Sequence, residues 1–333
     1  MRLIHRTTPA IIDTKDGSPS HYVAALETPV IGGVPQGILV RGMDTRNPGL
    51  LILHGGPGGA YIGCARAWFG DLESRWVVVN WDMRGAGLSF SREVPADSLT
   101  GGQLAQDALQ VQEWVRSRFG VDRWILAAHS FGTLVAPFVL RQGPDRFEGY
   151  MAISPAPTDS AAEAESYSWT LSRAQEGRNR RAVRDLERIG HPPYGSGFRG
   201  LDVRARWTDR LGGAIEGATG SDIVFRAMRR GTEYTWGDLF RRFLPGVRFW
   251  MRNLDESLGP DSTEANSWDL PVPLLVVSGS VDWMAPLAAS RRSFERAQAP
   301  RKQFIELPGL GHYPFVQDPR GFANALENLR PSS

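Results

Sequence analysis

Three polar residues of the types used in nucleophilic catalysis stand in loops that follow apolar runs. Ser130 comes two residues after the end of the apolar run 124–128, and a helix-like segment begins at once behind it. Asp282 and His312 lie later in the chain, each behind another apolar segment. A serine hydroxyl, an imidazole and a carboxylate can together cleave acyl bonds, because the imidazole removes the serine proton while the carboxylate orients the imidazole.

The residues around Ser130 read Ala-His-Ser-Phe-Gly, positions 128–132. In a nucleophile elbow, usually Gly-x-Ser-x-Gly, a tight turn between strand and helix lifts the serine side chain out of the fold. Ala128 replaces the first glycine, which adds one methyl at a position that has to be small. A serine with small neighbours also occurs in ordinary loops, so the rest of the chain must decide between the two interpretations.

A glycine-rich segment, His-Gly-Gly-Pro-Gly-Gly at positions 54–59, follows the apolar run 50–53. Glycine lets the backbone approach a substrate closely and aim an N–H at a developing negative charge. A simple turn at the strand exit is the alternative interpretation. A phosphate-binding loop is disfavoured, since the segment has neither a Gly-Lys-Ser/Thr ending nor a Gly-x-Gly-x-x-Gly pattern.

The candidate acid and base follow predicted strands near the end of the chain. Asp282 comes after the strand 273–278 and before Pro286, which can begin a helix, although an isolated loop aspartate is more often a turn former. His312 lies between glycines after the strand 303–307 and can reach over the sheet edge. Position favours it over the other histidines, which are His5, His21, His54, His129 and His191.

The elements that must position these residues form two α/β regions, about 20–155 and 271–330. The predicted strands cover 21–27, 37–41, 50–54, 76–81, 123–128, 149–154, 273–278 and 303–307. The predicted helices cover 99–118, 131–142, 286–297 and 319–329, and the first has a buried stripe of Leu104, Ala108, Val111, Val115 and Phe119. Strands that alternate with helical crossovers predict a mostly parallel sheet with helices on both faces.

Residues 158–268 have a different character, with many arginines, few strand patterns and helical periodicity. We predict a core of 1–157 and 269–333 and a helical cap at 158–268. One apolar stripe in the cap either packs on the core or lines a substrate pocket; it comprises Trp236, Leu239, Phe240, Phe243, Leu244 and Val247. The arginine-rich stretch 173–210 is either a solvated helix face or a funnel for anionic substrates.

Composition narrows the classes of function. The 333 residues hold 38 Lys+Arg against 36 Asp+Glu, a balance that suggests no nucleic-acid partner. Cys64 is the only cysteine, so no intrachain disulfide and no cysteine-based metal cluster can form. No run is apolar enough for a signal peptide or a membrane span, so we expect a cytoplasmic protein without metal or cofactor.

Together these motifs resemble the α/β-hydrolase fold, and most closely the proline iminopeptidase-like serine hydrolases of peptidase family S33. The resemblance rests on positions 54–59, the Trp-Asp-Met-Arg-Gly-Ala-Gly-Leu-Ser segment 81–89, the elbow, the acid and the base. It implies Ser130 as nucleophile, His312 as general base and Asp282 as the orienting carboxylate. It also implies an oxyanion hole made by the N–H groups of Phe131 and Gly56, with Gly55 as the alternative to Gly56.

The resemblance leaves the substrate open. Proline iminopeptidases carry acidic cap residues in an Ala-Arg-x-Glu-x-His-Tyr-Phe-like stretch, and this chain has none. Candidate substrate contacts are Glu233, Tyr234, Trp236 and Trp283, and Asp82 with Arg84 is interpreted as an ion pair that braces a loop. We expect a serine hydrolase for a small ester, lactone or amide. The alternatives are an aminopeptidase, and an acyltransferase, C–C hydrolase or ligand-binding protein on the same fold.

Overall fold

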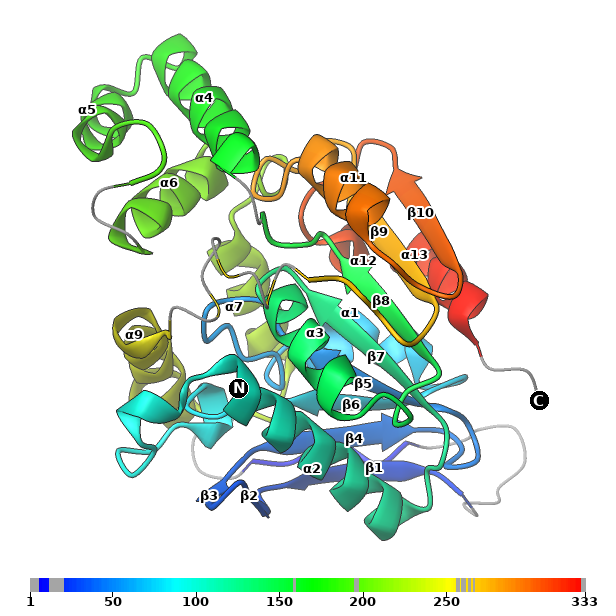
Figure 1. The fold of residues 1–333 in the computed structure, drawn as a ribbon. Coiled ribbons are helices and arrows are strands. Elements are labelled where there is room, and N and C mark those ends of the chain that lie inside the picture. Colours follow the sequence, from blue (N-terminus) through cyan, green and yellow to red (C-terminus); the bar gives the residue numbers. More distant parts are fainter. Residues whose placement is uncertain are drawn as a thin grey trace.

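The sheet that positions the site has eight strands in the order β1-β4-β6-β5-β7-β8-β9-β10 (Figure 1). The computed structural model describes residues 6–11, 21–157, 160–194, 198–255, 258, 262, 265 and 267–330. The strands are β1 Val23–Glu27, β4 Ile38–Gly42, β5 Gly49–Leu53, β6 Val77–Trp81, β7 Trp124–His129, β8 Gly149–Ile153, β9 Leu274–Gly279 and β10 Lys302–Leu307. A separate hairpin pairs β2 Val30–Ile31 with β3 Val34–Pro35.

The predicted mostly parallel sheet is confirmed. β1 and β4 pair antiparallel at one edge, β4 pairs antiparallel with β6, and all further pairs from β6 to β10 are parallel. The carboxyl ends of β5, β7, β8, β9 and β10 therefore meet at one edge of the sheet. Open α/β sheets build their sites at this edge, because the loops that leave parallel strands converge there.

Helices cover both faces, as predicted. On one face lie α2 Gly101–Phe119 and α3 Gly132–Gln142, and on the other α1 Ala65–Phe69 and α13 Pro319–Leu326. Neighbouring residues of one strand serve different faces: Leu51 packs with α2 and α3, whereas Leu50 packs with α1 and α13. The predicted stripe of α2 is confirmed, because its members are buried or half-buried in the first of these cores: Leu104, Ala108, Val111, Val115 and Phe119.

The remaining helices of the core are short or lie near the chain end. They are α11 Leu287–Arg296, α12 Pro314–Gln317 and the 3₁₀ turns η1 Gly70–Leu72, η2 Gly87–Ser89, η3 Ala96–Ser98 and η6 Glu327–Leu329. No described helix combines the length and the apolar character needed to cross a lipid bilayer. Among the residues that the structure describes, no group of three or more His, Cys, Asp or Glu side chains is arranged to hold a metal ion.

Between β8 and β9 the chain forms a helical insertion. Its elements are α4 Ser160–Glu176, α5 Arg180–Ile189, α6 Phe198–Arg210, α7 Gly220–Arg230, α8 Trp236–Asp238, the π-helix η4 Leu239–Phe243 and α9 Leu244–Asn253. Helices α4 to α6 stand apart from the sheet around a small core of their own (Figure 1). The predicted cap begins at position 158, which lies outside the described residues, and its last residue, Trp268, packs edge-on against Tyr150 of the main core.

The single apolar stripe predicted for this insertion is wrong. Phe240 is 63% exposed and Leu244 is 39% exposed, whereas Leu239 and Phe243 pack against the core. The cause is the π-helical turn, in which the N–H of Leu244 binds the carbonyl of Leu239. A wider turn rotates the following residues, so positions spaced three and four apart no longer share one face.

Candidate active site

Ser130 occupies a strained turn at the end of β7. Its φ is +49°, a value that non-glycine residues rarely adopt, and α3 begins two residues later. The Ser130 N–H donates to the carbonyl of Ile153 at 2.9 Å, which ties the turn to β8. A Cβ on Gly132 would lie 2.5 Å from the carbonyl oxygen of Leu53, so this glycine is required, whereas Ala128 is accommodated within the sheet.

The structure brings Ser130, His312 and Asp282 into one chain of hydrogen bonds. His312 Nε2 lies 2.9 Å from Ser130 Oγ, and His312 Nδ1 lies 2.8 Å from Asp282 Oδ2. The other oxygen of Asp282 accepts the N–H groups of Met284 and Ala285 at 2.8 and 2.9 Å. The carboxylate is therefore held by its own loop and presents one oxygen to the imidazole.

His54 fixes the shape of the glycine-rich loop. Its Nδ1 donates to the carbonyl of Gly55 at 2.7 Å, since a carbonyl only accepts, and its Nε2 accepts the N–H of Met83 at 3.1 Å. Burial lowers the pKa of His54 to about 4, which keeps this neutral tautomer near pH 7. The role of His54 is thus to tie the loop to the segment after β6.

The predicted oxyanion donors are available. Within the part of the chain that the structure describes, neither the Gly56 N–H nor the Phe131 N–H donates a hydrogen bond. Gly56 has φ +156°, and a Cβ there would lie 2.4 Å from the nitrogen of Gly58. At the alternative position, Gly55, a Cβ would meet Tyr61 Oη at 2.7 Å. Both positions therefore need glycine, and the loop backbone can approach a ligand closely.

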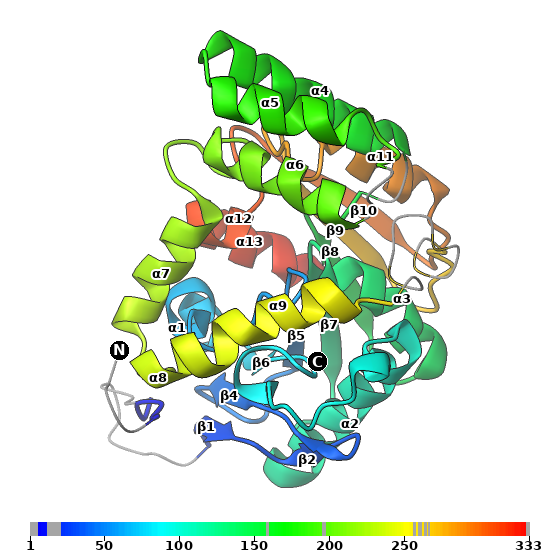
Figure 2. The ribbon, with the colours of Figure 1, turned by 90° about the vertical axis from the view of Figure 1, so that its left-hand side faces the viewer.

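Helix α9 of the insertion packs onto this loop. Trp250 is fully buried, its ring lies edge-on to Phe131 at 5.5 Å, and its Nε1–H donates to the carbonyl of Arg84 at 2.9 Å. A Cβ on Gly58 would lie 3.0 Å from the same ring. Figure 2 shows α9 running across the end of the sheet where β5 and β7 finish. The insertion thus packs against the glycine-rich loop and the turn that follows Ser130.

A second segment of the insertion holds the loops of Asp282 and His312. The carbonyl of Gly213 accepts the N–H of Trp283 at 2.8 Å, and the carbonyl of Ala214 accepts the N–H of His312 at 2.7 Å. Trp283, predicted as a substrate contact, stacks on Trp169 of α4 with ring centroids 5.2 Å apart. Its indole therefore joins the loop of Asp282 to the insertion.

Two further predicted substrate contacts have internal partners. Glu233 is 1% exposed and its Oε1 lies 2.6 Å from Nε of Arg66. The Tyr234 hydroxyl donates to the carboxylate of Asp82. These contacts brace the insertion against the core, so we do not retain either residue as a substrate ligand. The third, Trp236, lies beside Phe225 within the insertion, with ring centroids 6.0 Å apart.

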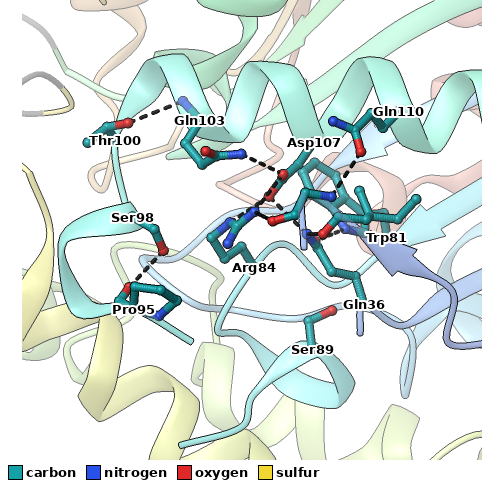
Figure 3. A network of polar contacts seen from close by, with 12 residues as sticks. Gln36, Trp81, Arg84, Ser89, Pro95, Ser98, Thr100, Gln103, Asp107 and Gln110 are labelled. Carbon is teal, nitrogen blue, oxygen red and sulfur yellow. Dashed lines mark hydrogen bonds and ion pairs between the residues drawn. The ribbon is translucent and has the colours of Figure 1, made fainter. Parts of the chain in front are cut away.

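The predicted ion pair between Asp82 and Arg84 is wrong. Arg84 instead forms a two-pronged contact with Asp107 of α2, at 2.7 and 2.8 Å, within the network drawn in Figure 3. Asp82 accepts the N–H of Leu88 at 2.9 Å and the hydroxyl of Tyr234. The two side chains are near in sequence, but each finds a distant partner, because the segment leaves β6 and packs between other elements.

Asp82 predicts a pH dependence of stability. Burial raises the pKa of Asp82 to about 6, above its ordinary value of 3.8. The group therefore stabilises the folded chain fully below about pH 4, and this stabilisation, about 3 kcal/mol, is lost as the pH rises through about 6. Urea unfolding should show that the free energy of unfolding of the wild type falls by about 3 kcal/mol relative to that of Asp82→Asn between pH 4 and pH 7.5. A difference that stays constant with pH would contradict the assignment.

Two residues that the sequence did not single out as part of the site interact with His312. Asp209, near the end of α6, accepts the Gly220 N–H at 2.7 Å and interacts electrostatically with His312; burial raises its pKa. His129 contacts the backbone of His312. No local motif indicates that Asp209 interacts with His312, because this interaction depends on how α6 packs. For His129, the sequence signal that could have identified it is its position directly before Ser130.

Comparison with known proteins agrees with this architecture. Residues 48–319 match the alpha/beta hydrolase fold family. A probable aminopeptidase of Bacillus subtilis is 32% identical over 305 residues, which cover 91% of this chain and 95% of that protein. Similar solved structures include a proline iminopeptidase-related protein from Thermus thermophilus (TM-score 0.63, 23% identity, 94% of this chain and 99% of that one). Another is an esterase from a Rhodococcus species (TM-score 0.59, 20% identity, 93% of this chain and 98% of that one).

The likeness to the solved structures concerns the fold alone, whereas the family match and the Bacillus relative extend over most of the sequence. With the sheet order and the strand-end loops described above, they lead to one assignment: this chain belongs to the α/β-hydrolase fold family.

Proposed function

We propose that this protein is a serine hydrolase that cleaves a small ester, lactone or amide through an acyl-enzyme. The observation that carries the proposal is the chain Asp282–His312–Ser130, with contacts of 2.8 and 2.9 Å, at the carboxyl edge of the parallel strands. The N–H groups of Gly56 and Phe131 belong to the adjacent turns after β5 and β7, and the pairing of these strands holds the two turns side by side.

In the proposed mechanism His312 first acts as a base. Its Nδ1–H donates to Asp282, which leaves the Nε2 lone pair to accept the proton of Ser130 as Oγ attacks the substrate carbonyl. The N–H groups of Gly56 and Phe131 would stabilise the negative charge on the carbonyl oxygen. The imidazolium then protonates the leaving group. Water, deprotonated by His312, hydrolyses the acyl-enzyme and restores Ser130.

We further propose that the helical insertion is a cap that shapes the substrate pocket. The support is its two attachments to the site, through Trp250 beside Phe131 and through Gly213 and Ala214 to the loops of Asp282 and His312. A small molecule or a short peptide fits a site enclosed in this way.

A fluorophosphonate probe tests the reaction class. It should label the wild-type protein once, and peptide mass spectrometry should locate the label on Ser130. Absence of labelling in the wild-type protein, or equal labelling of Ser130→Ala, would contradict the proposal. A panel of p-nitrophenyl esters and lactones against Pro-, Ala- and Leu-arylamides then defines the bond that is cleaved.

One observation favours an aminopeptidase as a second candidate function. Asp209 brings a carboxylate from the insertion near enough to His312 to interact with it electrostatically, and a carboxylate there could hold the ammonium group of a peptide. The similarity to the probable aminopeptidase of Bacillus subtilis points the same way.

The aminopeptidase candidate has its own test. If it is correct, Asp209→Asn should lower kcat/KM for arylamides with a free amino group at least tenfold, since a charge-assisted contact to the ammonium group is worth about 1.5–3 kcal/mol. Turnover of a p-nitrophenyl ester, which carries no amine, should change little. Wild-type protein that cleaves the esters and no arylamide would exclude this candidate.

A further inference from the structure

His129 is a fully buried histidine that the proposed mechanism leaves unused. It is the last residue of β7, directly before Ser130, and it is 1% exposed. Both of its ring nitrogens have a partner: Nδ1 lies 2.5 Å from the hydroxyl of Tyr61, and Nε2 lies 2.7 Å from the backbone carbonyl oxygen of His312.

The partners of His129 determine its protonation. A carbonyl oxygen only accepts, so Nε2 must carry the proton that it shares with His312. Burial lowers the pKa of His129 well below its ordinary value, so the ring is neutral and Nδ1 is an acceptor. The Tyr61 O–H therefore donates to Nδ1, and this contact fixes the orientation of the ring whose Nε2–H donates to His312.

The two ends of this contact chain belong to two parts of the site. Tyr61 follows the glycine-rich loop, and a Cβ on Gly55 would lie 2.7 Å from its hydroxyl and 2.8 Å from Nδ1 of His129. The other end is the backbone of the base itself. The rings of His129 and His312 lie 4.8 Å apart, and Phe315 packs edge-on against His129 at 5.0 Å. The ring of His129 is therefore held on several sides.

We propose that His129 is a positioning residue, which holds the backbone of His312 so that its Nε2 stays within hydrogen-bond distance of Ser130 Oγ, while Tyr61 holds the ring of His129 in place. The proposal rests on the serine hydrolase function proposed above. The backbone N–H of His312 is held in turn by the carbonyl of Ala214, so the base is fixed through both of its backbone polar groups.

The test compares two replacements of similar length. The amide nitrogen of His129→Gln reaches about as far as Nε2 and can donate to the His312 carbonyl, whereas His129→Met fills the same space without a donor. We expect His129→Met to lower kcat about 100-fold with KM within about twofold, since small misplacement of a catalytic group has an effect of this size. His129→Gln should recover at least tenfold of that loss. Equal kcat values for the two folded variants would overturn the proposal.

Tyr61→Phe provides an independent test that leaves His129 in place. Loss of the O–H donor leaves Nδ1 of the buried ring without a partner and removes the contact that fixes the orientation of the ring, so kcat should fall about tenfold. Tyr150→Phe is the matched control, because the buried Tyr150 hydroxyl has no hydrogen-bond partner in the described chain. An unchanged kcat in Tyr61→Phe, or an equal loss in Tyr150→Phe, would count against the proposal.

Failure of this inference can be separated from failure of the proposed function. If a fluorophosphonate does not label wild-type Ser130, the serine hydrolase function itself is wrong. If wild type is labelled and turns over, but His129→Gln and His129→Met behave alike at equal unfolding midpoints, only the positioning role is wrong.

Discussion

Replacing Ser130 with alanine is expected to lower kcat by about 10⁶-fold, because no other described group in the site is placed to form the acyl-enzyme. The Cβ and the backbone at φ +49° are unchanged by this substitution, so the turn keeps the strain that it already has. The side-chain contact that is lost runs from Oγ to His312 Nε2. The free energy of unfolding should therefore change by no more than about 1 kcal/mol.

Steady-state turnover of the best substrate in the panel measures this loss, with urea unfolding run in parallel. A residual rate above that of water is expected, since the N–H groups of Gly56 and Phe131 can still stabilise the oxyanion. A folded Ser130→Ala protein that retains more than about 1% of the wild-type kcat would contradict Ser130 as the nucleophile, given the loss expected when a triad serine is removed.

Asp282→Asn is expected to lower kcat by about 10⁴-fold through the tautomer of His312. Oδ1 of Asp282 accepts two backbone N–H groups, from Met284 and Ala285, so the asparagine oxygen will occupy that side. The amide NH₂ must then face Nδ1 of His312, where the carboxylate oxygen now accepts at 2.8 Å. An NH₂ group only donates, which forces the proton onto Nε2 and removes the lone pair that Ser130 needs.

This loss should appear in kcat for every substrate, together with much slower fluorophosphonate labelling. Asp318→Asn is the control, because Asp318 caps α13 through the Gly321 N–H and asparagine caps helices as well as aspartate. Loss of activity in both variants would indicate a general effect of the substitution, and full activity in Asp282→Asn would remove Asp282 from the mechanism.

Much of this architecture could be predicted from the sequence because its signals are local. The strands of the sheet are short apolar runs, and the ends of each predicted strand agree with those of an observed strand to within two residues. Ser130, Asp282 and His312 each follow such a run, so parallel pairing of the strands is enough to bring their loops to one edge.

The errors occur where contacts join distant parts of the chain. Arg84 pairs with Asp107 of α2 rather than with Asp82, and Glu233 pairs with Arg66 of α1. The π-helical turn after Asp238 rotated the predicted apolar stripe of the insertion. The sequence shows the charged residues and the helical periodicity. Packing between distant elements decides which residues pair and which side chains face the core.

The sequence by itself determined the class of fold and pointed to the three residues proposed for acyl transfer, because a strand followed by a loop is encoded by neighbouring residues. Only the tertiary structure decided the contacts that surround them: Trp250 against the oxyanion loop, Ala214 on the N–H of His312, and His129 on its carbonyl. These contacts join segments far apart in the chain, and hydrogen bonds of a few ångströms depend on how helices and strands pack, which no local pattern specifies.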